Sequence, residues 1–101
     1  MSNYRNEATD RLLSTIVKLK DIDECYAFFD DICTIKEILD MAQRFDTAIR
    51  LDRGESYSRI ASEVGVSTAT ISRVNRCLEY GAGGYRNAIE KMKEETENAD
   101  R

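Results

Sequence analysis

The chain has 101 residues, and 15 Lys and Arg against 19 Asp and Glu give it a formal net charge of −4 at pH 7. Hydrophobic residues make up 42% of the sequence, which argues against a disordered chain. Its length predicts a single domain, residues 1–101, with a modest core. Because the sequence contains no proline and only five glycines, little interrupts a helix, and we expect an all-α fold.

The residue types that several kinds of chemistry need are missing. There is no histidine, and Cys25, Cys33 and Cys77 show no CxxC spacing, so we expect reduced core thiols and no metal site. No apolar run approaches the length of a membrane span, and no signal peptide is visible, so we expect a soluble, cytoplasmic protein without membrane partners. Paired carboxylates, a glycine-rich phosphate loop and an activated nucleophile are also absent, so we do not expect an enzyme.

Two helices are predicted in the N-terminal third. Residues 7–20 carry an amphipathic pattern, and acidic residues at 21–23 mark a break and a new helix start. Residues 25–33 then place large apolar side chains around most of the helix circumference. Such a helix must be covered from more than one direction, which one chain of short helices can hardly achieve. We therefore expect a homodimer with substantial mutual burial.

The longest helix is predicted at about residues 35–51. Thr34 and Glu37 have the spacing of a capping box, in which each side chain accepts a hydrogen bond from the other residue's free amide. Apolar residues from Ile35 to Ile49 recur on one face. The Arg53-Gly54 pair is expected to end the helix, and Ser56 can cap the next one.

The stretch at about residues 57–78 has the pattern of a helix-turn-helix. Ile60, Ala61 and Val64 share one helical face, and Gly65 follows where a left-handed backbone would end the helix. Ser67 can cap the second helix, in which residues 71, 74 and 78 are apolar and lie on one face. The alternative reading is a purely structural helical hairpin with a polar outer face.

A last helix is predicted beyond the glycine-rich stop at residues 81–84. Tyr85, Ala88, Ile89 and Met92 lie at helical spacing, and we expect the acidic tail from Glu94 to fray.

The charge is unevenly distributed along the chain. Residues 44–86 hold seven Lys and Arg against five Asp and Glu, whereas residues 1–43 hold five against nine and residues 87–101 hold three against five. The local positive excess therefore coincides with the predicted helix-turn-helix. Since local charge governs attraction to phosphates, the negative net charge of the whole chain does not exclude double-stranded DNA as a partner.

The polar residues of the helix-turn-helix divide by the contacts that they could make to DNA. Short side chains near the start of the second helix can approach base edges, and those expected to do so are Ser67, Thr68, Ala69, Thr70 and Ser72. The residues expected to contact phosphates are Ser58, Arg59, Ser62, Arg73 and Arg76. For Ser58, Arg59 and Ser62 the alternative is simple exposure to solvent.

The capped long helix, the Leu51-to-Ser56 stretch LDRGES and the stretch GVSTATISR at residues 65–73 resemble the Trp repressor family, in particular its YerC/YecD branch. This resemblance implies six helices and an intertwined symmetric homodimer, with a helix-turn-helix on each subunit spaced for successive major grooves.

The same resemblance implies a ligand site. Arg44 and Arg73 match the two arginines that enclose the co-repressor's indole ring in the family, and Thr34 matches a threonine near the ligand's amino group. Two positions depart from the pattern, with Val74 in place of a glycine and Cys77 in place of a serine. Valine adds volume where the ring would enter, so tryptophan is disfavoured and another small-molecule effector remains open. The alternative for both arginines is contact with phosphates or ion pairing.

Together these features predict a dimeric, sequence-specific transcriptional regulator, acting as a repressor, with no cofactor beyond a possible effector. The alternative is a helical protein-interaction module that docks a protein on its helix-turn-helix face. The two differ in salt dependence, because DNA binding collapses as salt rises.

Overall fold

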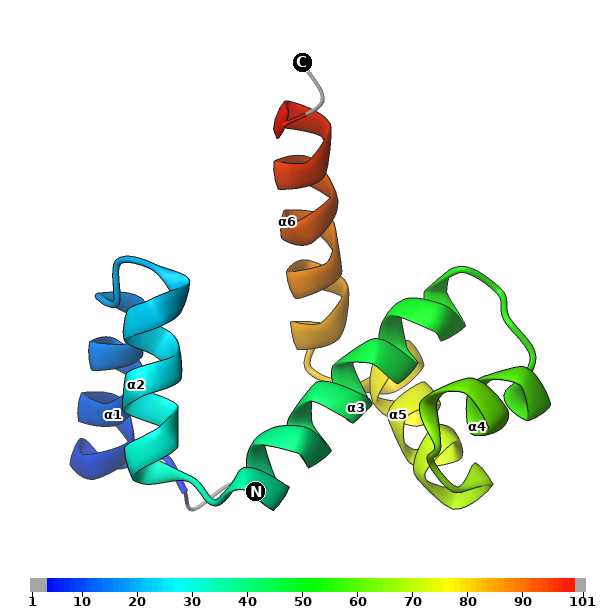
Figure 1. Ribbon diagram of the computed structural model, residues 1–101, viewed down its shortest axis with the longest axis horizontal. Helices are drawn as coiled ribbons and strands as arrows, with labels where there is room; N and C mark the ends of the chain where they lie inside the picture. Colours follow the sequence, from blue (N-terminus) through cyan, green and yellow to red (C-terminus); the bar gives the residue numbers. More distant parts are fainter. Residues whose placement is uncertain (1–3, 100–101) are drawn as a thin grey trace. The chain divides into compact units, whose positions relative to one another are not determined.

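The structure is a computed structural model that describes residues 4–99, with side chains described as far as Glu95. Within these residues the chain forms six α-helices and no strand (Figure 1). The helices are α1 (Glu7–Val17), α2 (Ile22–Ile32), α3 (Ile35–Asp52), α4 (Tyr57–Val64), α5 (Thr68–Tyr80) and α6 (Gly84–Ala99). The predicted all-α, six-helix fold is therefore confirmed. The chain divides into two compact units, one ending at Ile38 and one beginning at Leu39, and the single-domain assignment stays a prediction.

Each helix of the N-terminal unit begins at a side-chain cap. The Asn6 side chain accepts the Thr9 amide at 2.9 Å, and Asp21 accepts the Glu24 amide at the same distance. The capping box is present: the Thr34 amide donates to Glu37 Oε1 at 2.8 Å, and the Glu37 amide donates to Thr34 Oγ1 at 3.1 Å. These caps satisfy amides that have no partner inside their own helix, and so fix where α1, α2 and α3 start.

The N-terminal unit has little core of its own. Helices α1 and α2 run in opposite directions (Figure 1), and neither contains a buried residue. The rings of Phe28 and Phe29 meet edge to face at 5.7 Å and are only half-buried. In contrast, Val17 is 83% exposed and Ile35 77%. Apolar surface of this extent costs free energy in water unless another surface covers it.

The C-terminal unit has a continuous core. Ala48 of α3, Val74 and Leu78 of α5, and Ile89 of α6 are buried against one another. Partly buried residues surround them, namely Phe45, Ile49, Leu51 and Tyr85. The predicted apolar stripes of three helices thus converge, and they hold α5 between α3 and α6.

The connection between α4 and α5 forms as predicted. Gly65 ends α4 with φ of 84°, in the left-handed region, and its amide donates to the Ala61 carbonyl at 3.0 Å. The hydroxyl oxygens of Ser56 and Ser67 cap the two helices by accepting the amides of residues 59 and 70. Ile60 and Ile71 are fully buried and α4 packs on α5, so the two helices form one rigid unit.

Two boundaries differ from the predictions. Helix α1 ends at Val17 rather than near Lys20, because the Lys18 and Leu19 amides turn to the carbonyls three residues earlier. Helix α6 continues through the acidic tail to Ala99, so the expected fraying from Glu94 was wrong. Lys93 of α6 pairs with Asp52 at 2.9 Å, which fixes the helix close to the point where fraying was expected to begin.

Gly65→Ala should destabilise the protein by roughly 1–2 kcal/mol, because an L-residue is strained at this left-handed backbone. No atom lies within 4 Å of the position that an added Cβ would occupy, so backbone strain alone sets the cost. Chemical denaturation at fixed protein concentration measures the effect. Gly84→Ala is the matched control: its Cβ would be equally free, its φ is not positive, and stability should stay equal or rise. Equal losses for both variants would contradict backbone strain as the cause.

Candidate nucleic-acid interface and effector cavity

Helix α5 is fixed by its buried side, which leaves its opposite side in solvent. Ile71, Val74 and Leu78 are at most 4% exposed. The other face carries predicted DNA-contact residues that are all exposed, namely Thr68, Ala69, Ser72, Arg73 and Arg76. The structure therefore brings a methyl group, two hydroxyls and two guanidinium groups onto one accessible surface. Neither arginine forms an ion pair with any residue among those described.

Two of the predicted base-contact hydroxyls also have an internal role. Ser67 Oγ accepts the Thr70 amide at 3.1 Å and donates to Thr70 Oγ1 at 3.1 Å. Ser67 is exposed, whereas Thr70 is half-buried. A serine at this position can cap the helix and still accept a second hydrogen bond, because its oxygen has two lone pairs. Of the predicted base-contact residues, all but Thr70 are therefore exposed.

Helix α4 presents its predicted phosphate contacts on an exposed face. Ser58 and Ser62 are exposed, and Ser58 Oγ lies 3.4 Å from Ser56 Oγ. Arg59 is 65% exposed, but its Nε donates to Glu63 Oε2 at 3.1 Å and lies 3.7 Å from Glu55 Oε1. Arg59 thus has acidic partners, whereas the described residues provide none for the arginines of α5.

A network of charges joins the end of α3 to α4. Arg50 lies 3.4 Å from Asp46, 3.1 Å from Glu55 and 2.5 Å from Glu63, and its side chain is only 24% exposed. The hydrogen bond from Arg59, followed by that from Arg50, lowers the pKa of Glu63. Hydrogen bonding to Glu63 in turn raises the pKa of Arg50. Glu63 is therefore ionised at neutral pH, and its share of the network is lost only when the pH falls through that lowered pKa.

This network was not predicted, although the sequence contains a signal for part of it. The pairs 46–50 and 59–63 have the i, i+4 spacing at which helical side chains meet. The contact from Arg50 to Glu63 crosses between two helices and has no such local signature.

A cavity of about 270 Å³ opens between α3, α5 and the start of α6. It is lined by Arg44, Thr70, Arg73, Val74, Cys77 and Tyr85. The two arginines proposed as ligand contacts thus reach one cavity, and neither forms an ion pair with a described residue. With the hydroxyls of Thr70 and Tyr85 they form a surface suited to a small anion or carboxylate.

Three further residues bear on the predicted ligand site, namely Thr34, the third predicted ligand residue, and the two departures from the family pattern, Val74 and Cys77. Val74 lines the cavity while only 2% exposed, as expected for a residue that belongs to the core. Cys77 lines it with an exposed thiol. Thr34 belongs to the N-terminal unit, where its hydroxyl caps α3. Tyr85 was not predicted, because a tyrosine at the start of a helix gives no sequence signal for a cavity in the folded chain.

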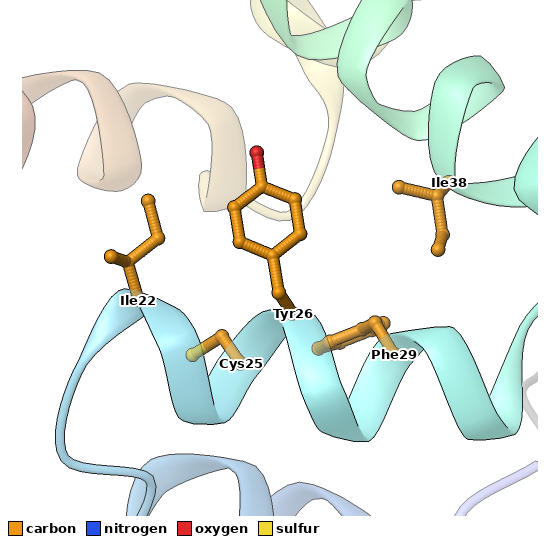
Figure 2. A pocket seen from close by; sticks show the side chains of 5 residues that line it. All are labelled: Ile22, Cys25, Tyr26, Phe29 and Ile38. Carbon is orange, nitrogen blue, oxygen red and sulfur yellow. The ribbon is translucent and has the colours of Figure 1, made fainter.

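The N-terminal unit carries an apolar groove of about 180 Å³. Figure 2 shows its lining, which consists of Ile22, Cys25, Tyr26, Phe29 and Ile38. Ile22 is 68% exposed and Tyr26 59%, so much of the lining faces solvent. The groove contains no charged side chain, which makes it suited to apolar groups of another surface.

Residues 4–99 contain neither a helix suited to cross a membrane nor a cluster of side chains suited to hold a metal ion. No helix in that range is both long and apolar enough to cross a membrane. The same part of the chain contains no group of three or more Cys, Asp or Glu residues arranged to hold a metal ion.

Comparison with known proteins identifies the family. The Trp repressor protein family matches residues 7–93. The uncharacterised protein YerC of Bacillus subtilis (strain 168) is 50% identical over 102 residues, covering 100% of this chain and 98% of its own. A TrpR-like protein from Eubacterium eligens ATCC 27750 has a solved structure that is similar at a TM-score of 0.85, with 48% identity over 88% of this chain and 92% of the other.

A candidate Trp repressor from Staphylococcus aureus is also similar, with a TM-score of 0.85 and 43% identity over 88% of this chain and 89% of its own. Both the matched residues and the helical architecture agree with the resemblance seen in the sequence. The chain therefore belongs to the Trp repressor family.

Proposed function

We propose that this protein is a cytoplasmic DNA-binding transcriptional regulator, and not an enzyme, which represses transcription by occupying a promoter site. The observation that carries the proposal is the exposed face of α5, where hydroxyls, a methyl group and two arginines lie opposite a fully buried stripe. A helix fixed on one side and polar on the other can enter the major groove without losing its packing. Membership of the Trp repressor family supports the same conclusion.

The contacts divide between base readout and attachment to the backbone. Short side chains at the start of α5 would read base edges, and we assign this role to Ser67, Thr68, Ala69, Thr70 and Ser72. Phosphate contacts would fix the orientation of the protein on the duplex, and we assign them to Ser58, Arg59, Ser62, Arg73 and Arg76.

The working form would be an intertwined homodimer. The apolar groove on α2, the absence of buried residues in α1 and α2, and the exposed Ile35 and Leu39 all require a cover. A second copy of the chain offers the same apolar surface in return, as a two-fold interface requires. Two helix-turn-helix units would then bind half-sites about one helical turn apart on a pseudo-palindromic operator.

The cavity beside α5 would allow a small-molecule effector to act on DNA binding. Arg73 lines the cavity and is also a proposed phosphate contact, so a ligand bound there would change the charge that α5 presents to DNA. Arg44 and Arg73, which form no ion pair with any residue that the structure describes, favour an anionic ligand. Val74 fills space between the cavity and the core, which disfavours tryptophan.

Two substitutions on α5 should distinguish the contacts to phosphates from the contacts to base edges. Arg76→Ala should weaken binding evenly across sequences and reduce the slope of log affinity against log salt by about one, because one phosphate contact is lost. Thr70→Ala should reduce the preference for the specific site and leave the salt slope unchanged. Fluorescence anisotropy on a selected duplex and a scrambled one, over a salt series, measures both.

The opposite pattern, with Arg76→Ala altering site preference, would exchange the assigned roles. If the wild-type protein binds no duplex even at low salt, but captures a protein in a salt-insensitive manner, the protein-interaction function replaces this proposal.

Tyr26→Lys should shift the protein from dimer towards monomer and lower its unfolding temperature, because a charge would enter the apolar groove on α2. Sedimentation velocity over a concentration series measures the change. Asp30→Lys, which introduces the same residue at an exposed site of the same helix, should leave the dimer intact although it changes the charge more. A monomeric wild-type protein at micromolar concentration would contradict the proposed assembly.

Tryptophan at millimolar concentration should leave the melting temperature of the wild-type protein unchanged, since Val74 fills the space that the indole ring would need. Val74→Ala should gain measurable tryptophan binding, despite the expected cost in core packing. Isothermal titration calorimetry tests both proteins. Tight binding of tryptophan to the wild type would show that the cavity opens further than its present lining indicates.

A further inference from the structure

The arginine of α4 differs from those of α5 in its surroundings. Arg59 is held by Glu63 at 3.1 Å and lies 3.7 Å from Glu55, whereas Arg73 and Arg76 have no acidic partner among the described residues. All three are exposed cations on the proposed DNA-binding surface. Within the described part of the chain, α5 thus presents two arginines without an acidic partner and α4 presents one arginine with acidic partners.

Glu63 is itself held in place from the other side. Arg50 of α3 contacts Glu63 Oε2 at 2.5 Å and Glu55 Oε1 at 3.1 Å, and Arg50 is only 24% exposed. Asp46 adds a third acidic group at 3.4 Å from the same guanidinium. Glu63 therefore stays at its position whether or not Arg59 remains bound to it.

We propose that Glu63 competes with DNA phosphates for the Arg59 guanidinium, so that an internal ion pair lowers the affinity of the protein for DNA of any sequence. This inference rests on the proposed DNA-binding function. A carboxylate and a phosphate present similar oxygen acceptors to a guanidinium group, so one can replace the other. Because the Arg59 pair is exposed, water and salt weaken it, and a phosphate can displace it at a modest cost.

The consequence is a weaker sequence-independent attachment to DNA. Phosphate contacts provide most of the sequence-independent affinity for DNA. An arginine that must leave a carboxylate before it reaches a phosphate contributes less to binding at random sites. Base contacts from α5 would then account for a larger part of the total binding free energy, while the ratio of specific to random-site affinity stays the same because the Arg59 contact is weakened at both.

A double-mutant cycle on Glu63 and Arg59 tests the proposal. The probe is a random-sequence duplex, and fluorescence anisotropy over a salt series gives affinity and salt slope for the wild type, Glu63→Gln, Arg59→Gln and the double variant. Glu63→Gln should raise affinity by about two- to fivefold, the range expected for an exposed ion pair. Its salt slope should steepen by up to about one. In the Arg59→Gln background the same change should give clearly less gain, because only the general effect of removing a negative charge remains.

Arg76→Gln is the matched control, since it removes an arginine that has no internal partner among the described residues. In the wild-type background Arg59→Gln should cost less affinity than Arg76→Gln. This comparison leaves the Arg50–Glu63 contact intact and decides the matter even if Glu63→Gln loosens the fold, which a thermal melt followed by circular dichroism would reveal. Equal losses for the two arginine variants, or equal gains from Glu63→Gln in both backgrounds, would overturn the proposal.

DNA binding and the competition by Glu63 can fail separately. If the wild-type protein binds no duplex at low salt, the proposed function fails, and this inference fails with it. If the wild type binds DNA but the cycle shows no coupling, only the competition by Glu63 is wrong.

Discussion

The buried stripe of α5 is the constraint on which the rest of the C-terminal unit depends. Val74 and Leu78 close the core against Ala48 of α3 and Ile89 of α6, while Ile71 is buried in the same unit. Since these side chains fix the rotation of α5 about its own axis, they also determine which residues remain in solvent. The hydroxyls and arginines of the opposite face are therefore positioned by packing that none of them takes part in.

Ion pairs add further links between the helices of this unit, whose positions are set mainly by the apolar core. Asp52 at the end of α3 receives Lys93 at 2.9 Å and Arg86 at 3.7 Å, both from α6, and Arg86 Nε also donates to the Leu78 carbonyl at 3.0 Å. On the other side of the unit, Arg50 ties α3 to the acidic residues around α4. Such partly exposed pairs contribute little individually, but they connect helix ends that the apolar core does not reach.

Local signals in the sequence were sufficient for most of the fold. The Thr34–Glu37 capping box, the left-handed Gly65 and the Ser67 cap depend on residues within four positions of one another, and all three form as predicted. The apolar spacing in α5 was equally informative, because a regular helix converts spacing directly into a face.

Features that depend on contacts between distant segments were harder to predict. The contact from Arg50 to Glu63 depends on how α3 and α4 cross. The cavity needs Tyr85 from α6 to complete a lining begun by α3 and α5. Helix α6 persists to Ala99 although its tail is acidic, and Lys93 pairs with a residue 41 positions earlier in the chain. Local propensity carries no information about such pairings.

The most direct test of the proposed function is selection of binding sites by the purified protein from a random duplex library. We expect enrichment of a pseudo-palindrome whose half-sites lie about 10 base pairs apart, centre to centre, because two copies of α5 would enter successive major grooves. Adding a metabolite extract to a parallel selection allows for a required effector. Failure to enrich any symmetric sequence under either condition would contradict a dimeric helix-turn-helix regulator.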